Sequence, residues 1–415
     1  MTERTYRRDS YRRQCTTVVT ARRAMAGRGP AIALEETLFY PAGGGQPADR
    51  GYVDGLAVID VVEEDGQIWH VLETSAGVDG GVAAVPALGA RVVATIDWDR
   101  RFDHMQQHTG QHILSQAFLQ VLDAPTVSVH MARTCTVDLA IASLDDEAIA
   151  RVERLANRIV MDNRPVHIRE VDATEAARAG LRRPPRQTGL IRVVEVEGFD
   201  RSACGGTHVR ATAEVGPVLI RRWERYKGGV RVQFLCGWRA IGDYDYLRRF
   251  AREVAARLTA GEADAVEAVR RLQDRVRDLE RDLQAARDAL LEHEAARLVE
   301  AAGGPPGPDA PRIIAAALAG RSIAEVRALA RLITSQPHRV AVLVSAQDGR
   351  MFVARSADVD LDAAAVVRVV VGAFGGRGGG RAEAAEGAAP AAPSADALVE
   401  AARAAAAERC RLAGG

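Results

Sequence analysis

The spacing of hydrophobic and polar residues changes along the chain, and each pattern predicts a different kind of element. Up to residue 97, short runs rich in β-branched residues alternate with Gly and Asp turns, which is typical of strands. These strands are expected over residues 15–20, 57–62, 68–72 and 92–96. Between 248 and 302, apolar residues repeat every seven positions with charges between them, which predicts a short coiled coil or an antiparallel helical arm.

The middle of the chain, from 98 to 247, mixes the two patterns. Residues 106–119 are mostly compatible with a helix, and residues 145–162 have their apolar positions on one side of an amphipathic helix. A short polar turn is expected over 125–128. Strands are expected over residues 134–141, 166–171, 190–196, 218–226 and 230–235, of which the last two form a hairpin. We therefore expect an α+β domain here.

A linker rich in Gly and Pro over 303–308 precedes the C-terminal part of the chain. Beyond it, the pattern predicts a strand over 313–317, a helix over 323–334 and strands over 340–345 and 351–356. The Ala-rich end is expected to be a helix from an N-cap at Ser394 to Leu412. A small α/β domain is the expected result.

These patterns place the chain in the α+β class, with four regions. They are a β-rich, β-barrel-like N-terminal domain with a Gly-rich loop (1–97), an α+β domain (98–247), a helical coiled-coil arm (248–302) and a C-terminal α/β domain (303–415). The length of 415 residues fits two to four domains.

Two motifs in the second region carry metal-binding side chains. His108 and His112 are four positions apart, which places both imidazoles on one face of a helix. The segment Cys204-Gly-Gly-Thr-His208 adds a thiolate and a third imidazole, and its glycines permit a tight turn. Two His from the first motif with the Cys and His of the second match a tetrahedral zinc set.

Other interpretations of these motifs are open from the residues alone. The two helical histidines could pack without a ligand role, and Cys204 could be a small buried hydrophobic residue. His104 extends the histidine row by one turn, and only two of the three helical imidazoles can easily reach one ion. The spacing does not decide which two.

A second candidate site is the glycine-rich stretch 38–51. Gly43, Gly44 and Gly45 stand between two prolines and precede Gln46, which predicts a loop whose backbone N–H groups can face a ligand closely. The alternative is a hairpin linker without a ligand. The stretch is not a Walker loop, because no Gly-Lys-Ser/Thr follows, and its spacing does not fit a dinucleotide fingerprint.

Composition narrows the class of protein. Lys+Arg and Asp+Glu are equal at 55 each, so contacts with nucleic acid must come from local patches. Five scattered cysteines argue against a disulfide framework. The N-terminus has no secretory signal pattern, and the longest apolar run is too short to span a bilayer. We therefore expect a cytoplasmic protein with no membrane contact.

Basic residues gather in irregular or glycine-rich segments. Residues 182–186 and the arginines around Lys227 are two such clusters, and either could contact phosphates or be a solvated surface. Residues 372–381 combine six glycines with Arg377 and Arg381, which suits a phosphate backbone or ribose edges. Taken alone, this stretch could equally be a loop without a function.

Three segments follow one another in the chain: Phe39–Pro47, His108-x3-His112 and Cys204-Gly-Gly-Thr-His208. These segments and their order closely resemble those of the alanyl-tRNA editing proteins of the AlaX family. The likeness extends from about Tyr6 through Arg239. The arm and the C-terminal domain resemble the DHH-associated domain that ends alanyl-tRNA synthetases and long AlaX proteins. No segment reads as an aminoacylation domain, so the resemblance points to an editor rather than a ligase.

The resemblance implies zinc (Zn2+) held by His108, His112, Cys204 and His208, which favours the 108/112 pair over His104. It implies an aminoacyl-tRNA deacylase that hydrolyses the ester of tRNA for alanine mischarged with serine or glycine. The C-terminal domain is expected to bind the outer corner of that tRNA. The heptads are compatible with a homodimer.

A site that prefers serine to alanine must hydrogen-bond the hydroxyl. Gln111, Thr126 and Ser128, in or just after the histidine helix, are the catalytic-site candidates for that contact. Gly43 to Gln46 are expected to close over the aminoacyl adenosine. Two other functions stay open: a tRNA-binding module with a structural zinc, and a metal-dependent phosphoesterase, although no Asp-rich two-metal cluster is present.

Overall fold

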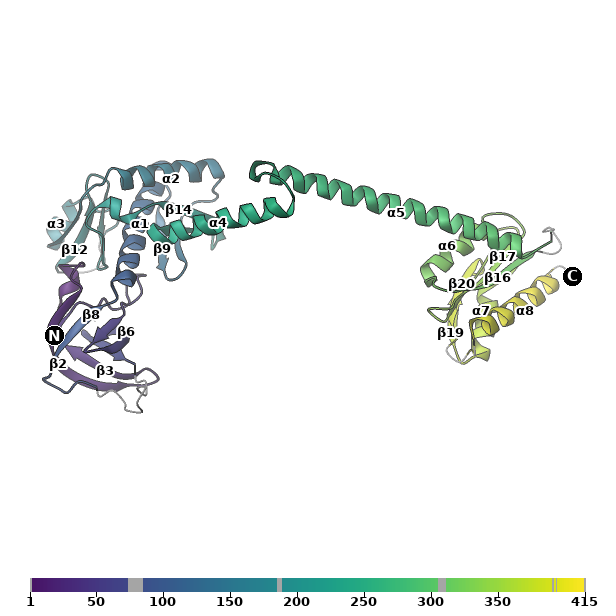
Figure 1. The fold of residues 1–415 in the computed structure, drawn as a ribbon, viewed down its shortest axis with the longest axis horizontal. Helices are drawn as coiled ribbons and strands as arrows, with labels where there is room; N and C mark the ends of the chain where they lie inside the picture. The colour runs from purple at the N-terminus through teal and green to yellow at the C-terminus, as the bar shows by residue number, and fades with distance from the viewer. Residues whose placement is uncertain are drawn as a thin grey trace. The chain divides into compact units, whose positions relative to one another are not determined.

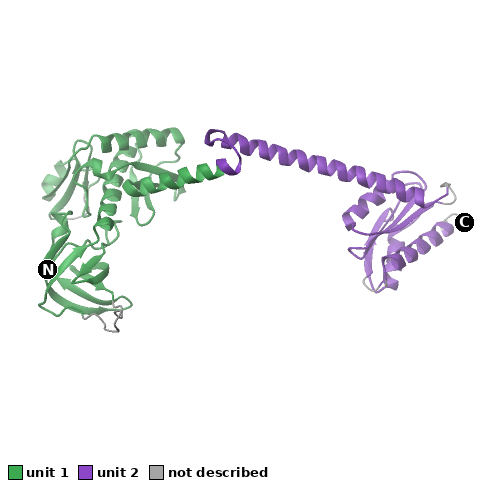
Figure 2. Ribbon diagram, viewed as in Figure 1, with its two compact units in different colours: residues 1–254 green, residues 255–415 purple. Residues whose placement is uncertain are grey.

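The computed structural model describes residues 2–73, 85–184, 189–304, 311–389, 392 and 394–413. They fall into two compact units, Met1–Val254 and Ala255–Gly415, which Figure 2 shows in different colours. No described helix has the length and apolar character needed to cross a membrane. The expected linker at 303–308 lies partly outside the described residues.

The first unit begins with a closed six-stranded barrel, in the order β2-β3-β7-β6-β5-β8 (Figure 1). Its strands are β2 (Gln14–Met25), β3 (Gly29–Leu34), β5 (Gly51–Val53), β6 (Leu56–Glu64), β7 (Gln67–Leu72) and β8 (Arg91–Ile96). Along β2 the residues from Gln14 to Val19 alternate between outward and buried positions, as the β-branched pattern predicts. The short strands β1 (Glu3–Arg4) and β4 (Glu36–Thr37) pair in parallel beside the barrel, next to the 3-10 turn η1 (Thr5–Arg7).

Helix α1 (Trp98–Leu122) is the central element of the rest of the unit. Asp97 caps its N-terminus by accepting a hydrogen bond from the Arg100 N–H. Most of its residues from Met105 to Phe118 are buried on all sides, so α1 lies in a core rather than on a surface. The expected helix around the two histidines is confirmed.

Two sheets and two further helices surround α1. A four-stranded sheet has the order β14-β15-β10-β9, and a three-stranded sheet has the order β11-β12-β13. The elements are β9 (Thr126–Met131), β10 (Cys135–Leu139), α2 (Asp146–Met161), β11 (Val166–Val171), α3 (Ala173–Arg178), β12 (Ile191–Val196), β13 (Asp200–Ala203), η2 (Thr212–Val215), β14 (Val218–Tyr226) and β15 (Gly229–Cys236). The predicted strands over 166–171 and 190–196 and the hairpin are confirmed within a residue.

The predicted polar turn over 125–128 is wrong. Thr126 to Met131 form β9, which pairs antiparallel with β10. The β-branched residues Thr126, Val127 and Val129 suit a strand, and the polar Ser128 bonds to Asp138 on the neighbouring strand instead of turning the chain. The short polar stretch was therefore misjudged because its partner strand lies later in the sequence.

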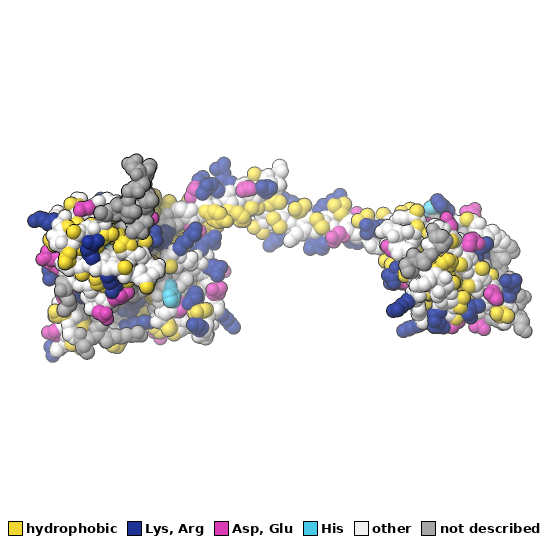
Figure 3. All heavy atoms as spheres, turned by 90° about the horizontal axis from the view of Figure 1, so that it is seen from below, with side chains coloured by type: hydrophobic (Ala, Val, Ile, Leu, Met, Phe, Trp, Pro, Cys, Tyr) yellow, Lys and Arg dark blue, Asp and Glu magenta, His cyan; other side chains and the backbone are white. Residues whose placement is uncertain are grey.

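The first unit ends at Val254, within helix α4 (Gly237–Arg257), and η3 (Glu262–Asp264) and α5 (Ala265–Ala301) follow in the second. The helix α5 is continuous over the predicted heptads. Its heptad residues Val269, Leu272, Val276, Leu279, Leu283 and Leu290 are all exposed. Figure 3 shows hydrophobic side chains along this arm. Pairing of α5 as a coiled coil stays a prediction.

The second unit ends in a five-stranded sheet of order β16-β17-β18-β20-β19. Helix α6 and the end of α5 cover one face, and α7 and α8 cover the other. The elements are β16 (Arg312–Leu318), α6 (Ile323–Thr334), β17 (Arg339–Ser345), β18 (Arg350–Arg355), α7 (Ala363–Ala373), β19 (Arg377–Gly380), β20 (Ala384–Ala388) and α8 (Ala395–Ala413). Ser394 caps α8 as predicted, because its Oγ accepts from the Ala397 N–H at 3.1 Å.

The glycine-rich stretch of this unit is not a simple loop. Its residues Arg377–Gly380 form β19, an edge strand paired with β20. Gly378 must be a glycine there, because an added Cβ would overlap with the backbone of Gly387 and the side chain of Val367.

Candidate metal centre

Two segments of the first unit bring four metal-binding side chains together. His108 and His112 project from α1, and Cys204 and His208 lie in the turn that follows β13. One ligand atom from each residue lies within 4.8 Å of all the others. The Cys204 Sγ is 3.3 Å from Nε2 of both His108 and His208. The two motifs predicted from the sequence therefore meet at one point.

Each of the three imidazoles is held by its other ring nitrogen. Nδ1 of His108 lies 2.8 Å from Oε1 of Gln46, and Nδ1 of His112 lies 3.0 Å from a carboxylate oxygen of Asp200. Nδ1 of His208 lies 3.1 Å from the hydroxyl oxygen of Thr109. The oxygens of Gln46 and Asp200 can only accept, so His108 and His112 donate to them from Nδ1–H and, as neutral imidazoles, turn the lone pair of Nε2 toward the cluster.

This donor set fits zinc. One thiolate and three neutral imidazoles are a tetrahedral zinc set, in which neighbouring N and S donors stand about 3.5 Å apart. The observed separation of 3.3 Å between Sγ and two imidazole nitrogens is close to that value. The outer partners of the histidines also match the carboxylate and amide contacts that orient metal-ligating histidines.

The electrostatics of the cluster favour a thiolate. Burial opposes charge on Cys204, but the imidazoles of His108 and His208 hold the pKa of its thiol well below the ordinary value. Burial also opposes charge on His112, while hydrogen bonds to Asp200 and Cys204 raise its pKa to about 9. Burial and the charge of His108 lower the pKa of His208. The thiolate that these imidazoles favour would be the one negatively charged ligand of the set, which suits a cation.

The turn that carries Cys204 depends on one of its two glycines. A Cβ on Gly206 would overlap with the ring of His108 and would lie 2.9 Å from Oε1 of Gln46. A Cβ on Gly205 would have no heavy atom within 4 Å. Gly206 is therefore needed for the close approach of the turn to α1, whereas Gly205 is not.

The glycine-rich loop of the barrel is fixed at both ends. At its base, the fully buried Asp49 pairs with the fully buried Arg101 of α1. At its tip, the amide of Gln46 also accepts from the Thr207 N–H at 3.1 Å and donates to the Thr207 hydroxyl at 2.8 Å. The loop is thus bound to α1 and to the cysteine turn, and the barrel contributes directly to the metal centre.

A cavity of about 570 Å³ opens beside the cluster. The metal-binding residues His108, His112 and Cys204 line it, as do Gly43 and Gly44 of the glycine-rich loop. Five arginines complete much of its wall: Arg4, Arg7, Arg182, Arg183 and Arg192. The candidate metal centre thus lies beside a cavity that is lined by cations. Such a cavity suits the negatively charged end of a polymer.

The three proposed serine contacts have different positions. Gln111 and Thr126 both line the cavity, and both donate to the Ser115 hydroxyl, at 2.7 Å and 2.8 Å. Ser128 is not among the described residues that line the cavity, and its hydroxyl lies 2.5 Å from Asp138. The structure therefore brings together two of the three candidates.

The remaining predicted residues are also placed. His104 is buried outside the cluster, and burial lowers its pKa to about 4. Gly45 lies against β9, where its carbonyl accepts from the Met131 N–H at 3.0 Å. Arg377 and Arg381 are exposed, in and just after the edge strand β19 of the second unit.

Sequence reasoning missed three residues that support the site: Thr109, Asp200 and Arg192. Nothing in local spacing marks Asp200 as the partner of His112, which lies 88 positions away. Its place four residues before Cys204 was the only available signal. Thr109 and Arg192 had none.

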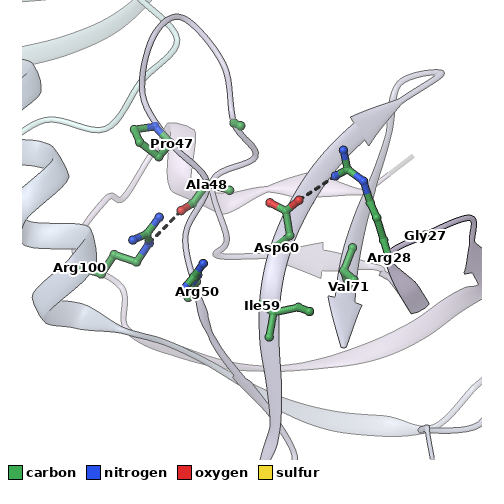
Figure 4. A pocket seen from close by; sticks show the side chains of 10 residues that line it. Gly27, Arg28, Pro47, Ala48, Arg50, Ile59, Asp60, Val71 and Arg100 are labelled. Carbon is green, nitrogen blue, oxygen red and sulfur yellow. Dashed lines mark hydrogen bonds and ion pairs between the residues drawn. The ribbon is translucent and has the colours of Figure 1, made fainter. Parts of the chain in front are cut away.

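A second hollow is lined in part by residues of the glycine-rich stretch 38–51 (Figure 4). It is lined by Ala48, Arg50 and Arg100, and by Arg28, which pairs with Asp60 at 2.7 Å. Nε of Arg100 donates to the carbonyl of Ala48 at 3.0 Å. This hollow contains no group of the metal centre.

Comparison with known proteins agrees with this architecture. The family "Threonyl and Alanyl tRNA synthetase second additional domain" matches residues 191–233, and the DHHA1 domain matches residues 311–408. The first match contains the cysteine turn. The chain is 33% identical to alanyl-tRNA editing protein AlaX-L of Pyrococcus horikoshii, with 60% of this chain and 61% of that protein covered. It therefore spans less than two thirds of that relative.

Two further relatives extend the comparison. Alanyl-tRNA editing protein Aarsd1 of Rattus norvegicus is 32% identical, with 66% of this chain and 68% of that protein covered. The alanine–tRNA ligase of Pyrobaculum neutrophilum is 35% identical over 61% of this chain but only 29% of the ligase. The crystal structure of the C-Ala domain from Aquifex aeolicus alanyl-tRNA synthetase matches 23% of this chain and 90% of its own, at 22% identity and a TM-score of 0.21.

A second additional domain with a cluster that could hold a metal ion, followed by a DHHA1 domain, defines a protein related to the accessory domains of alanyl-tRNA synthetases. Within that class, the chain belongs to the family of alanyl-tRNA editing proteins.

Proposed function

We propose that this protein is a zinc-dependent aminoacyl-tRNA deacylase that hydrolyses the ester of alanine tRNA mischarged with serine or glycine. The observation that carries the proposal is the cluster of His108, His112, Cys204 and His208 at the side of a cavity lined by arginines, in a chain of the alanyl-tRNA editing family. When bound, Zn2+ supplies a Lewis acid beside the ester.

The chain's own residues position the reaction. Gln46, Asp200 and Thr109 fix the three imidazoles, so the ligand atoms are ordered before substrate enters. Gly43 and Gly44 give the cavity a wall without side chains, against which the terminal adenosine can lie closely. The arginines of the wall face the charge of the tRNA end.

We propose that selectivity for serine comes from the Ser115 hydroxyl together with the two side chains that donate hydrogen bonds to it. Thr126 and Gln111 line the cavity, and both direct a hydrogen bond to Ser115. A serine hydroxyl can join this network, whereas alanine offers no polar group in exchange. A site that hydrogen-bonds a hydroxyl disfavours the analogue that lacks it.

The second unit is proposed to bind the body of the tRNA. Arg377 and Arg381 are exposed around the glycine edge strand β19, where backbone and cation can approach a phosphate together. Support for this role comes from the DHHA1 match and from the names of the relatives.

A homodimer through α5 is a further part of the proposal. Its exposed heptad residues, among them Leu272, Leu279 and Leu283, form an apolar stripe that a second helix could cover. Leu279→Glu should then convert a dimer to a monomer in sedimentation. A wild-type protein that is monomeric at micromolar concentration would contradict this part.

The proposed activity is tested by following the release of labelled amino acid from alanine tRNA charged with serine, glycine or alanine. Wild type should deacylate the serine or glycine ester and spare the alanine ester, and Cys204→Ala should be inactive. Ser128→Ala, on β9 but outside the cavity lining, is the control and should stay active. Retained tRNA binding without any hydrolysis would favour a binding module instead.

A further inference from the structure

Arg192 is a buried cation beside the metal centre that has no carboxylate partner among the described residues. It lies on β12 and is only 3% exposed. Its Nη1 donates to the carbonyls of Cys204 and Gly206, both at 2.8 Å, and its Nε donates to the carbonyl of Arg7 at 3.0 Å. Its Nη2 is buried and has no hydrogen-bond partner in the described part of the chain.

The other fully buried arginine of this unit provides a contrast. Arg101 pairs with the carboxylate of Asp49 and donates to the carbonyls of Ser10 and Leu38. Arg192 forms no ion pair with a carboxylate in the described part of the chain. Burial lowers its pKa, and the nearby Cys204 thiolate acts in the opposite direction. A buried donor without an acceptor is destabilising, and a charged one more so. If Arg192 only stabilised the fold, the hydrogen bonds of its Nε and Nη1 would be enough for that role.

Arg192 also forms part of the cavity wall. Arg192 lines the same cavity as His108, His112 and Cys204. Its bonds to the carbonyls of Cys204 and Gly206 fix the guanidinium to the turn that supplies a metal ligand. The cation is thus held rigidly at the wall of the cavity, where an acceptor on the substrate would complete its hydrogen bonding.

We propose that Arg192 is a catalytic residue whose Nη2 donates a hydrogen bond to the carbonyl oxygen of the scissile ester as negative charge builds on that oxygen. The inference rests on the proposed deacylase function. The oxygen of water bonds to the carbonyl carbon, and the carbonyl electron pair moves onto the oxygen that Arg192 faces. The pair then returns, the bond to the ribose oxygen breaks, and that oxygen takes a proton from the attacking water. The products are the free amino acid and the ribose hydroxyl.

The size of the expected effect follows from this role. A donor that is preorganised toward the developing oxyanion is typically worth about 10²–10³ in kcat. A guanidinium at this position is rigid before the reaction begins, because two of its nitrogens are already bonded to backbone. Its loss should therefore lower kcat and leave KM and zinc content near their wild-type values.

The test compares Arg192→Lys and Arg192→Gln with wild type on tRNA charged with serine, with bound zinc measured in each sample. Arg164→Lys is the matched control. Arg164 also donates to two backbone carbonyls, those of Glu197 and Gly198, but it does not line the cavity. Both Arg192 variants should lose about 10²–10³ in kcat at full zinc loading, and Arg164→Lys should lose little.

Three other results would overturn the inference. If zinc content fell in parallel with activity, Arg192 would only stabilise the cysteine turn. A raised KM with unchanged kcat would assign its free nitrogen to a phosphate of the tRNA end instead of the ester. Equal activity in wild type and both variants would show that Arg192 has no role in the reaction. A wild type without ester hydrolysis would overturn the proposed function as well, so the two failures are distinguishable.

Discussion

Oε1 of Gln46, in the glycine-rich loop of the barrel, lies 2.8 Å from Nδ1 of His108, in the central helix. The contact joins residues 62 positions apart and fixes which nitrogen of His108 faces the metal centre. The same amide oxygen accepts from the Thr207 N–H, so one side chain connects the loop, the helix and the cysteine turn.

Removing this acceptor should weaken zinc binding. Gln46→Met keeps the length of the side chain and loses the hydrogen bond, and we expect about 10–100-fold lower zinc affinity, as for other outer partners of metal ligands. Gln46→Glu keeps an acceptor for Nδ1–H and should stay closer to wild type. Competition with a chelating dye measures the affinity. Equal affinity in wild type and Gln46→Met would contradict the assigned role.

Replacing Gly205 or Gly206 of the cysteine turn by alanine should have sharply different effects on zinc binding. Gly206→Ala places a methyl group in the ring of His108, so zinc content and activity should both collapse. Gly205→Ala meets no protein atom within 4 Å and should keep its zinc content. Zinc per chain, measured by atomic emission on purified protein, separates the two. Similar zinc content in both variants would show that the turn is not packed against α1 as described.

The Thr126 hydroxyl should contribute to the choice between serine and alanine. Thr126→Val removes the donor to Ser115 while keeping the shape, and the ratio of kcat/KM for serine and alanine esters should fall about ten-fold, the value of one hydrogen bond. Ser128→Ala, on the same strand but outside the cavity lining, is the control and should keep the ratio. A larger loss in the control than in Thr126→Val would reject this network.

The buried ion pair of Arg101 and Asp49 should matter for stability far more than an exposed pair. Both side chains are 0% exposed, so Arg101→Met leaves an unpaired buried carboxylate and should cost about 3–5 kcal/mol in the free energy of unfolding. Arg28→Ala breaks an exposed pair with Asp60 and should cost about 1 kcal/mol or less. Urea titrations of both variants provide the comparison, and equal losses would refute it.

Acid should destabilise the barrel through His70. Its Nδ1 faces the Ile32 carbonyl, its Nε2 faces the Thr37 hydroxyl, and burial lowers its pKa from 6.5 to about 4. The unfolded chain therefore binds more protons between those values, and the free energy of unfolding falls as pH drops through this window. The shift corresponds to a contribution on the order of 3 kcal/mol.

The measurement is the free energy of unfolding at pH 7.5 and at pH 4.5, for wild type and His70→Gln. The variant should be less stable at neutral pH and should lose less stability on acidification. His104 contributes in the same direction, because burial also lowers its pKa to about 4. An identical pH dependence in both proteins would show that His70 is not held neutral.

The sequence predicted those parts of the molecule that short-range patterns determine. Strand 166–171 and the hairpin around Lys227 were recognisable because β-branched residues and a glycine turn suffice to specify them. The four ligands were recognisable because each motif places its two residues within one turn. The outer partners Gln46 and Asp200 could not be assigned, since they reach His108 and His112 across 62 and 88 residues.

The errors have a related cause. Residues 125–128 are polar and short, and only their pairing with β10 makes them a strand. The glycines after Arg377 likewise become an edge strand only because β20 is there to bond with them. In both cases a partner strand, which local composition does not reveal, decides the conformation.

The central claim is that zinc held by His108, His112, Cys204 and His208 is required for the hydrolysis of mischarged alanine tRNA. The most direct test removes metal with a chelator and titrates Zn2+ back while following deacylation of tRNA charged with serine. We predict that activity is lost without metal and returns fully at one equivalent of zinc per chain, and that Cys204→Ala does not recover. Full activity in the metal-free protein would contradict the account.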